Sequence, residues 1–498
     1  MRAFPLLPVC LAICAILLFG CTQAQPPKDK LGETFTGEQK LVAAYFYYWY
    51  PVPEMGELRD APPEGKPFGY SDVAWFKREL SDMEDAGIDI ALVSWWGKDK
   101  ETEHWSYIGL QNLVQAREEL IAEGGKPPKL AMFFDAIYDT YPDTVPKDMS
   151  TEEGKRFFYR HIYNFYSRVP KEHWARIDGK PITWFFSSGF GMKATQEGFD
   201  YFTQRFAQDF NETPLVVLAR GCTGNNCEFA GISSGLGFVW GAAPFGTQYE
   251  SVNQVGPGYD DFTKHAGNIV RDRENGFFYA QSWRSAISDA LQNNKKIIAL
   301  ETWNELYEGS EVCDTARYGR AYIELTKKYS DYFRQGVVPP EPVPKLRAVG
   351  FVSAALGKNP QFSGITVPYL QGMLFETHGG KECVSPKPNT TGTISPIGGG
   401  IANYLAPLDI GVADTFALAG PAGYSLEIEF FADTDKHFFV YAPELIGEFS
   451  AAATGGWETV SVPLPLARFR HEGSLGTDIR IEIEKTGLCI SGIELRRA

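Results

Sequence analysis

The strongest constraint on the fold is an alternation of short apolar segments with amphipathic helical segments between residues 41 and 334. The apolar segments are almost continuously hydrophobic, which is typical of parallel strands that are covered on both faces. About eight such segments over about 300 residues favour a (β/α)₈ TIM barrel over an open doubly wound sheet. Pro51 and Pro53 follow the first segment, where a dinucleotide-binding fold would have a glycine-rich turn, and this argues against that fold.

The hydrophobic periodicity predicts the individual elements of this barrel. Strands are expected at residues 41–50, 88–96, 129–134, 182–186, 215–219, 236–240, 277–281 and 297–301. Helices are expected at residues 76–86, 110–121, 157–166, 199–210, 283–291 and 318–333. Glycine-rich sequence between Cys222 and Asp261 obscures the sixth and seventh strands.

A second pattern begins after four prolines between Pro339 and Pro344. Short alternating strands, expected at residues 424–430, 438–441, 459–463, 479–483 and 487–495, predict a C-terminal β-sandwich that binds carbohydrate or braces the barrel. The predicted domains are therefore a barrel at 39–338, a stiff linker at 339–345 and a β-sandwich at 346–498.

The N-terminal segment has the features of a targeting sequence. Arg2 precedes an apolar run, and the run ends in Leu18-Phe19-Gly20-Cys21, which resembles a bacterial lipobox. We expect a signal peptide at 1–21, lipidation of Cys21 and a flexible tether at 22–38. A simple secretory peptide cut nearby is the alternative. No later run reaches the ~18 apolar residues of a membrane span, so the expected protein is an exported bacterial lipoprotein, anchored in the membrane and facing the periplasm or the cell surface.

The cysteines fit an exported protein. Beyond Cys21, five remain: Cys222, Cys227, Cys313, Cys383 and Cys489. Cys222 and Cys227 bracket a turn-rich Thr-Gly-Asn-Asn segment and are the expected disulfide. Cys383 and Cys489 form a second candidate pair only because both lie in the C-terminal region. The cysteines have no C-x-x-C spacing, and the seven histidines form no metal-binding motif, so neither a metal nor a cofactor is expected.

The charge balance restricts the partners. The chain has 47 Lys and Arg residues against 62 Asp and Glu residues, a net charge of −15. Nucleic-acid binding requires a basic surface, so it is not expected. Membrane contact is expected through the lipid anchor only, and the protein is expected to be a monomer.

Aromatic side chains gather at the predicted strand ends, where a barrel of this kind carries its active site. Their flat faces can pack against the C–H faces of sugar rings, while their polar edges remain free for hydrogen bonds. About half of them would point into the barrel interior instead, because side chains alternate along a strand. The candidates are Tyr47, Tyr48, Trp49, Trp95, Trp96, Trp240 and Trp303.

The sharpest feature is an acidic segment, Glu301 to Glu311, with four carboxylates in eleven residues. Glu305 and Glu308 are three residues apart, so a helical turn would place both on one face. Two carboxylates this close raise the pKa of one of them and so provide an acid beside a base, as glycoside hydrolysis requires. An acidic first turn favoured by the helix dipole explains the spacing equally well.

The segment Trp303-Asn304-Glu305-Leu306-Tyr307-Glu308-Gly309-Ser310 resembles the stretch after the last barrel strand in glycoside hydrolase family 99-like proteins, the group related to endo-α-mannosidases. The matches that support the resemblance lie in order along the chain, at residues 44–51, 94–97 and 256–260. The resemblance covers residues 40–335.

The resemblance implies roles for the two glutamates. Glu305 would act as a base on the sugar 2-hydroxyl, which attacks the anomeric carbon, and Glu308 would be the acid/base at the glycosidic oxygen. The sequence departs from the family at Leu306, Tyr307 and Ser310, where the family has Trp, His and Thr. These changes alter the walls beside the carboxylates, so the reaction is better supported than a mannoside substrate.

Further substrate-binding candidates are Asp135, Tyr259, Asp260, Asn304 and Tyr307. Asp135 ends a strand, although a helix-capping role is an alternative. Asp260 follows a Gly-Pro-Gly turn, where turn formation is the alternative. The expected function is that of a lipid-anchored glycoside hydrolase acting on an α-linked extracellular glycan. A glycan-binding lipoprotein that has lost catalysis is the alternative. A polysaccharide lyase is disfavoured, because no basic cluster for a uronate is visible.

Overall fold

The fold comes from a computed structural model. It describes residues 34–50, 58–97, 104–135, 148–186, 192–220, 229, 231–261 and 270–342. It further describes shorter segments of the C-terminal region: 351–356, 361–363, 365–366, 373–378, 380–386, 408–412, 424–432, 436–442, 445–451, 454–464, 478–483 and 488–497.

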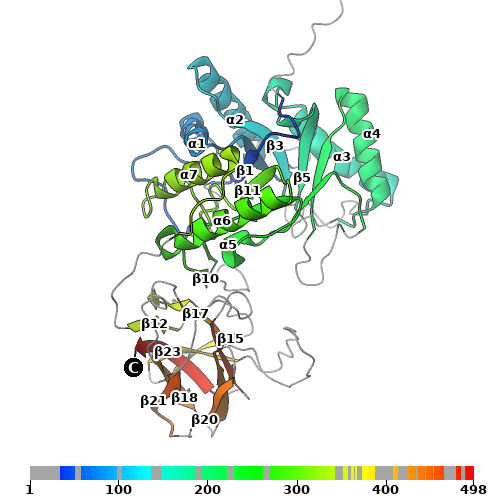
Figure 1. The fold of residues 1–498 in the computed structure, drawn as a ribbon. Coiled ribbons are helices and arrows are strands. Elements are labelled where there is room, and N and C mark those ends of the chain that lie inside the picture. Colours follow the sequence, from blue (N-terminus) through cyan, green and yellow to red (C-terminus); the bar gives the residue numbers. More distant parts are fainter. Residues whose placement is uncertain are drawn as a thin grey trace, which may run out of the picture.

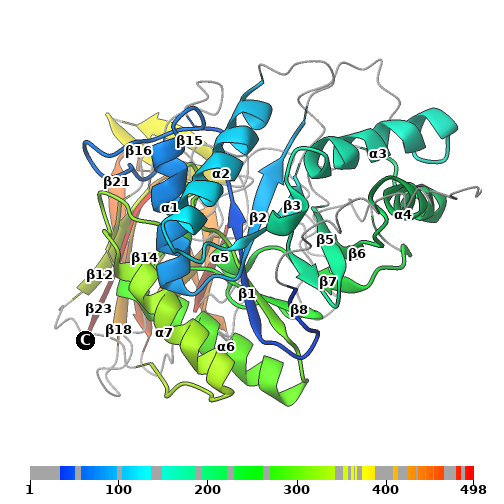
Figure 2. The same ribbon diagram turned by 90° about the horizontal axis from the view of Figure 1, so that it is seen from above.

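The first domain is built on eight parallel strands (Figures 1 and 2). They are β1 (Leu41–Phe46), β2 (Ile90–Trp95), β3 (Lys129–Phe134), β5 (Lys180–Phe185), β6 (Leu215–Ala219), β7 (Leu236–Phe238), β8 (Val252–Val255) and β11 (Ile297–Leu300). Hydrogen bonds join them in the order β7-β6-β5-β3-β2-β1-β11-β8. Chain order and spatial order agree around the ring, and this is the predicted TIM-barrel topology.

Helices follow most of these strands and cover the barrel from outside. They are α1 (Val73–Ala86), α2 (Trp105–Ala122), α3 (Glu152–Tyr166), α4 (Gln196–Phe210), the single turn α5 (Ala242–Phe245), α6 (Phe277–Gln292) and α7 (Ala321–Gln335). Side chains at the N-caps of the first four helices, Asp72, His104, Thr151 and Thr195, accept backbone N–H groups there. Smaller elements are β4 (Arg176–Ile177), η2 (Lys171–His173), β9 (Tyr259–Asp260), β10 (Val270–Arg271) and η3 (Glu274–Gly276).

Aromatic side chains fill the barrel interior. Tyr45 of β1 lies at the centre, and its hydroxyl accepts a hydrogen bond from Trp184 Nε1 at 3.0 Å. Its ring contacts Phe133 and Trp240 edge-on, with centroids 4.7 and 4.8 Å away. The Trp240 ring in turn stacks on Phe133 with an interplanar angle of 8°. The aromatic richness of the chain therefore serves the core as well as the strand ends.

One predicted strand is wrong. Residues 277–281 are the first turns of helix α6, because Phe277, Ala280 and Trp283 repeat at helical spacing and pack on the barrel as one buried face. The seventh barrel strand is β8, whose sequence Val-Asn-Gln-Val is too polar to stand out. Asn253 is nevertheless fully buried, since its amide donates to the Ala286 carbonyl at 3.0 Å and to Asp289 at 2.7 Å.

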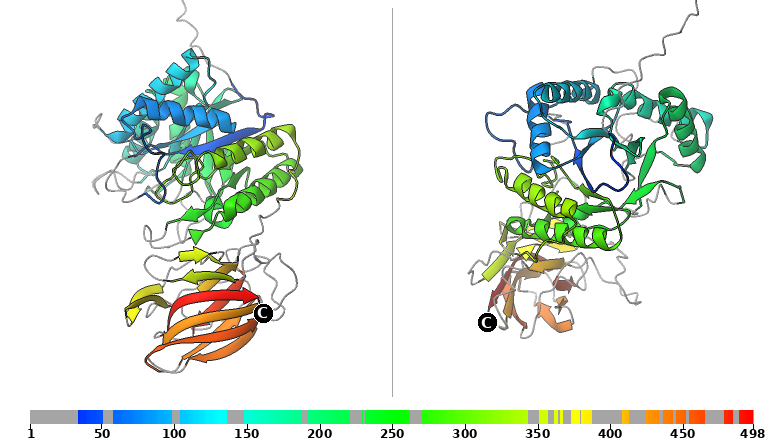
Figure 3. Two further views of the ribbon diagram at one scale, coloured as in Figure 1. Left: turned by 90° about the vertical axis from the view of Figure 1, so that its left-hand side faces the viewer. Right: turned by 45° about the horizontal axis from the view of Figure 1, so that its top comes forward.

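The second domain is a sandwich of two antiparallel sheets, as predicted (Figure 3). The seven-stranded sheet holds β12 (Phe351–Ala355), β13 (Gln361–Ser363), β15 (Met373–His378), β16 (Lys381–Pro386), β18 (Tyr424–Ala432), β21 (Trp457–Leu464) and β23 (Leu488–Arg497). The five-stranded sheet holds β14 (Ile365–Thr366), β17 (Leu408–Val412), β19 (Lys436–Tyr441), β20 (Leu445–Ala451) and β22 (Ile479–Ile483). The sandwich lies beside β10, and Val270 of that strand packs into the sandwich core.

The predicted pair Cys383–Cys489 is confirmed, with an S–S distance of 2.01 Å. Cys313 is a buried free thiol. Cys21 and the pair Cys222–Cys227 lie outside the described residues, as do the predicted signal peptide and part of the linker. The domain boundaries themselves stay predictions. Within the described segments, no helix combines the length and the hydrophobicity needed to cross a membrane.

Candidate active site

The acidic segment forms a closed loop at the carboxyl end of β11. The Thr302 N–H donates to the Ser310 carbonyl at 3.0 Å, and the Thr302 hydroxyl accepts from the Glu305 N–H at 3.0 Å. Residues 306–309 form hydrogen-bonded turns rather than the helical turn considered from the sequence. These turns still direct Glu305 and Glu308 to the same place, as their electrostatic coupling indicates.

Glu305 and Glu308 interact as a pair. Glu305 is 4% exposed, whereas Glu308 is partly exposed. Burial, followed by the neighbouring Glu308 carboxylate, raises the pKa of Glu305 well above its usual value, and one hydrogen bond from the Tyr307 N–H at 2.9 Å opposes the shift. Glu305 therefore keeps its proton to a higher pH than an ordinary glutamate does, beside the second carboxyl group of Glu308. The pair can therefore donate a proton from one member and accept a proton on the other.

Glu301 and Glu311, the outer carboxylates of the segment, have separate environments. Both oxygens of Glu301 accept from the Gly241 N–H at 3.1 Å, and one also accepts from the Ala243 N–H at 3.3 Å. Burial nevertheless raises the pKa of Glu301 to about 8. Glu311 forms an ion pair with Arg273 at 2.5 Å, although burial raises the pKa of Glu311 to about 7.

Asn304 joins the acidic loop to the end of β1. Its side chain accepts from the Tyr47 N–H and donates to the Tyr47 carbonyl, both at 2.8 Å. Tyr50 makes a second bridge, since its hydroxyl donates to the Asn304 carbonyl at 2.7 Å and accepts from the Leu306 N–H at 3.0 Å. Asn304 therefore positions the loop together with Tyr50, the last residue of the aromatic run that the sequence places at the end of the first strand.

Tyr47, Asp135 and Tyr259 surround the carboxylate pair. Burial, followed by the charges of Asp135, Glu305 and Glu308, raises the pKa of Tyr47 well above its usual value. Burial and the charge of Glu308 do the same for Tyr259, whose hydroxyl also hydrogen-bonds Glu308. Both phenols are therefore neutral donors at the site.

Asp135 is held at the end of β3 by two donors. Its carboxylate accepts from Trp96 Nε1 at 2.9 Å and from the Ser94 hydroxyl at 3.0 Å. Burial raises the pKa of Asp135 to about 6, and the charge of Glu308 adds to the shift. Ser94 was missed from the sequence, although it directly precedes Trp95-Trp96 in the strand.

Indole rings and an ion pair border the Glu305–Glu308 pair and Asp135. The Trp49 ring packs edge-on against Trp96 with centroids 5.3 Å apart, and Trp96 and Trp240 are both partly exposed. Asp260 forms an ion pair with Arg59 at 2.6 Å, and its N–H donates to the Glu308 carbonyl at 2.7 Å. Arg59 is a contact that nothing in its sequence neighbourhood indicated.

The structure does not bring three of the predicted binding residues to the pair. Tyr48 is fully buried and donates to the Ser106 carbonyl at 3.0 Å. Trp95 and Trp303 are also fully buried, and their indole N–H groups donate to the His161 carbonyl and to Glu79. Tyr307 is 7% exposed and stacks on the Tyr50 ring with centroids 5.3 Å apart.

Among the described residues, one group of potential metal ligands occurs, and it lies in the sandwich: His378, Cys383 and Cys489. The two cysteines are joined in the disulfide, so they offer no thiolates.

The family description "Domain of unknown function (DUF5010)" matches residues 29–342, and the chain belongs to this family. A comparison with curated protein sequences found no match. Among solved structures, the GH99 endo-alpha-mannosidase from Bacteroides thetaiotaomicron is similar, with 15% identity and a TM-score of 0.44, over 61% of this chain and 99% of that chain.

A structure described as a glycoside hydrolase-like protein is similar at 13% identity and a TM-score of 0.41, over 60% of this chain and 96% of that chain. The C-terminal CBM6 of LamC, a laminarinase from Zobellia galactanivorans, matches with 19% identity and a TM-score of 0.18, over 25% of this chain and 88% of that chain.

Proposed function

We propose that this protein is a glycoside hydrolase whose acid and base are Glu305 and Glu308. The observation that carries the proposal is the coupling of these two carboxyl groups at the carboxyl end of the barrel, where burial and mutual repulsion raise the pKa of Glu305. The neutral hydroxyls of Tyr47 and Tyr259 stand beside the pair as donors to the substrate or to the carboxylates.

The aromatic border supports a sugar as the substrate. The partly exposed indoles of Trp96 and Trp240 offer flat apolar faces, and Asp135 offers an acceptor for sugar hydroxyls. Following the family 99-like resemblance, Glu305 is the base on the 2-hydroxyl of an α-linked sugar, and Glu308 is the acid at the glycosidic oxygen. The raised pKa of Glu305 in the free protein means that Glu305 must lose its proton before it can act as the base.

The first prediction tests these roles. Glu305→Gln and Glu308→Gln each keep the shape of the side chain and remove its charge, so both variants should fold and should lose about a hundredfold or more in rate. A substrate with a phenolic leaving group needs little protonation. It should therefore partly rescue Glu308→Gln and leave Glu305→Gln inactive.

Hydrolysis of polysaccharides and of aryl glycosides checks this, with Glu197→Gln, an exposed change on α4, as the matched control. Rescue of Glu305→Gln instead would reverse the two roles. Near-normal rates in both variants would place the active site elsewhere in the chain. A parent protein that hydrolyses none of the substrates would leave a non-catalytic glycan-binding protein as the better description.

We also propose that the protein is held on a bacterial membrane by a lipid on Cys21, because the Leu-Phe-Gly-Cys sequence follows an apolar run and precedes a polar tether. Cys21→Ser should move the protein from the membrane fraction to the soluble fraction, which immunoblotting of the two fractions measures. Unchanged partition would mean that another feature holds the protein.

A further inference from the structure

The outer face of the seven-stranded sheet of the sandwich carries aromatic rings among polar side chains. Along β18, every second residue from Tyr424 to Ala432 is buried, and the residues between them face outward. Phe431 is the one aromatic residue among those outward positions, beside Ser425, Glu427 and Glu429. In the sheet register, Phe431 is paired with Trp457 of β21 on one side and with Cys489 of β23 on the other.

Three rings form a continuous row, which we call the ring row: His378 at the end of β15, Phe431 of β18 and Trp457 of β21. The His378 ring stacks on Phe431 with centroids 4.2 Å apart and an interplanar angle of 12°. The Phe431 and Trp457 centroids are 5.7 Å apart. The Trp457 indole N–H donates to the His378 carbonyl at 3.2 Å, so the indole is held in place. All three residues are partly exposed.

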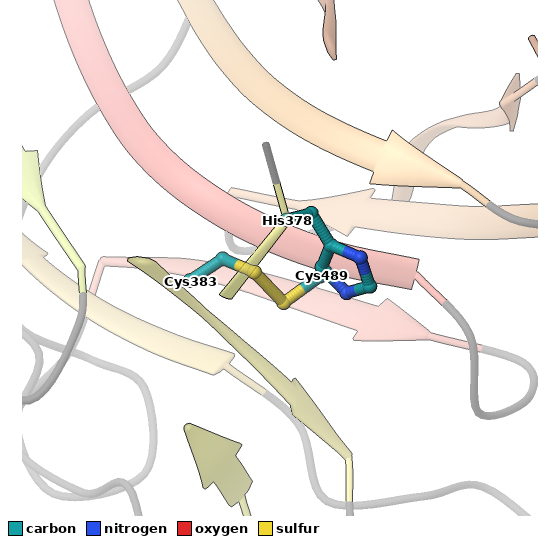
Figure 4. Close-up of side chains that lie close together, drawn as sticks. All are labelled: His378, Cys383 and Cys489. Atoms are coloured by element: carbon teal, nitrogen blue, oxygen red, sulfur yellow. A yellow bond between two sulfur atoms is a disulfide. The ribbon is translucent and has the colours of Figure 1, made fainter. Parts of the chain in front are cut away.

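The Cys383–Cys489 disulfide lies beside this row. Figure 4 shows the His378 ring beside the two sulfur atoms. Both cysteines are buried, and the bond ties β16 to β23 at Cys489, the residue of β23 that is paired with Phe431. The row is therefore rigid before any ligand arrives, and a rigid site loses little conformational entropy on binding.

Polar groups border the row, and their charges are paired. Glu429 accepts hydrogen bonds from Lys381 and, at 2.8 Å, from the Ser491 hydroxyl. The Lys381 ammonium also lies over the Trp457 ring, 5.1 Å from its centroid. His378 Nε2 lies 3.0 Å from Glu376. Lys381 and Glu429 are 43% and 34% exposed, so both can exchange these bonds for bonds to a ligand.

We propose that the ring row binds a neutral glycan chain laid across the strands, as a second carbohydrate site separate from the barrel. Aromatic faces pack against the C–H faces of sugar rings, and the exposed ends of Lys381 and Glu429 supply a donor and an acceptor for hydroxyl groups. A neutral chain fits better than an anionic one, because Lys381, the one lysine that the described segments place at the row, is already neutralised by Glu429. A polyuronate would have to displace that carboxylate.

The experiment uses the full chain with Glu308→Gln, so that hydrolysis does not consume the ligand. Electrophoresis through gels containing α-mannan, β-glucan, xyloglucan or starch measures affinity as retardation, and polygalacturonate serves as the anionic polymer. At least one neutral polymer should retard the protein. Adding Trp457→Ala should weaken that binding at least tenfold, while Trp457→Phe should retain part of it.

Tyr249→Ala removes an exposed tyrosine from the barrel and is the matched control, which should leave the retardation unchanged. The proposal is overturned if no neutral polymer retards the protein, if Trp457→Ala binds as well as its parent, or if polygalacturonate is bound best. It goes beyond the proposed function: a barrel without hydrolytic activity would leave this result unchanged.

Discussion

At the scale of single residues, identical side chains in one short segment have different chemistry because their surroundings differ. Glu305 is coupled to Glu308, Glu301 accepts backbone N–H groups at α5, and Glu311 is paired with Arg273. The sequence singles out Glu305 and Glu308 among the four carboxylates, but it does not show the surroundings of Glu301 and Glu311. Only the two that point toward Asp135, Tyr47 and Tyr259 have neighbours suited to proton transfer with a substrate.

Glu301 makes the stability of the barrel depend on pH. Its pKa is raised to about 8 in the folded protein, against an ordinary value of 4.5, so the folded state keeps a proton that the unfolded chain releases. The proton on Glu301 therefore contributes to the free energy of unfolding. This contribution is fully present below pH 4.5 and is lost as the pH rises through about 8.

Glu301→Gln should remove this dependence. At about pH 6 the variant should be less stable than the parent, because glutamine presents one acceptor oxygen where Glu301 has two. Between about pH 6 and pH 9, the difference in the free energy of unfolding between parent and variant should narrow by on the order of 2 kcal/mol. Thermal unfolding at several pH values would measure this difference. A gap that does not change with pH would mean that Glu301 is already ionised in the folded protein.

At the scale of the elements, the end of β1 decides which aromatic residues face the site. Tyr47 and Tyr48 are neighbours, yet the Tyr47 hydroxyl lies among the carboxylates and the Tyr48 ring lies under helix α2. Helix α2 comes so close that a Cβ at Gly109 would be 2.3 Å from a carbon of the Tyr48 ring. The helix thus needs glycine at this position for a packing reason.

Gly109→Ala should therefore destabilise the barrel by about 1–3 kcal/mol, although alanine is the better helix former. Chemical denaturation measures the loss. In a Tyr48→Leu background the same change should cost less, because the ring that the new Cβ meets has gone. Equal costs in both backgrounds would contradict the packing argument, and a net gain in stability would mean that propensity outweighs it.

At the scale of the whole molecule, the chain has two hydrophobic cores. The barrel core runs from Leu41 to Phe333, and the sandwich core holds Val270 together with residues from Leu356 to Leu495. The disulfide closes a loop of 106 residues within the sandwich. Loss of the disulfide should therefore lower the stability of the sandwich core.

Replacing both Cys383 and Cys489 by alanine should lower the unfolding temperature of the sandwich by about 5 °C or more, from a typical disulfide contribution of about 2–5 kcal/mol. Calorimetry should show this shift with the barrel transition unchanged. Cys313→Ala, at the buried free thiol of the barrel, should move the barrel transition instead. A parallel shift of both transitions in the double variant would mean that the two cores unfold as one unit.

The sequence by itself determined the class of the fold and the position of the acidic loop. Buried parallel strands must be apolar and alternate with helices, and the strands of the sandwich must alternate in polarity, so these patterns are visible in one dimension. It did not reveal β8, because Asn253 and Gln254 interrupt the apolar pattern by which a buried strand is recognised. Both side chains are nevertheless buried by tertiary contacts. It could not separate Tyr47 from Tyr48 or Trp96 from Trp95, since orientation depends on which neighbour a strand end meets. The spacing and the family resemblance already paired Glu305 with Glu308. Only the tertiary structure showed how the surroundings of Glu301, Glu305 and Glu311 differ, because pKa values follow burial and charge in space.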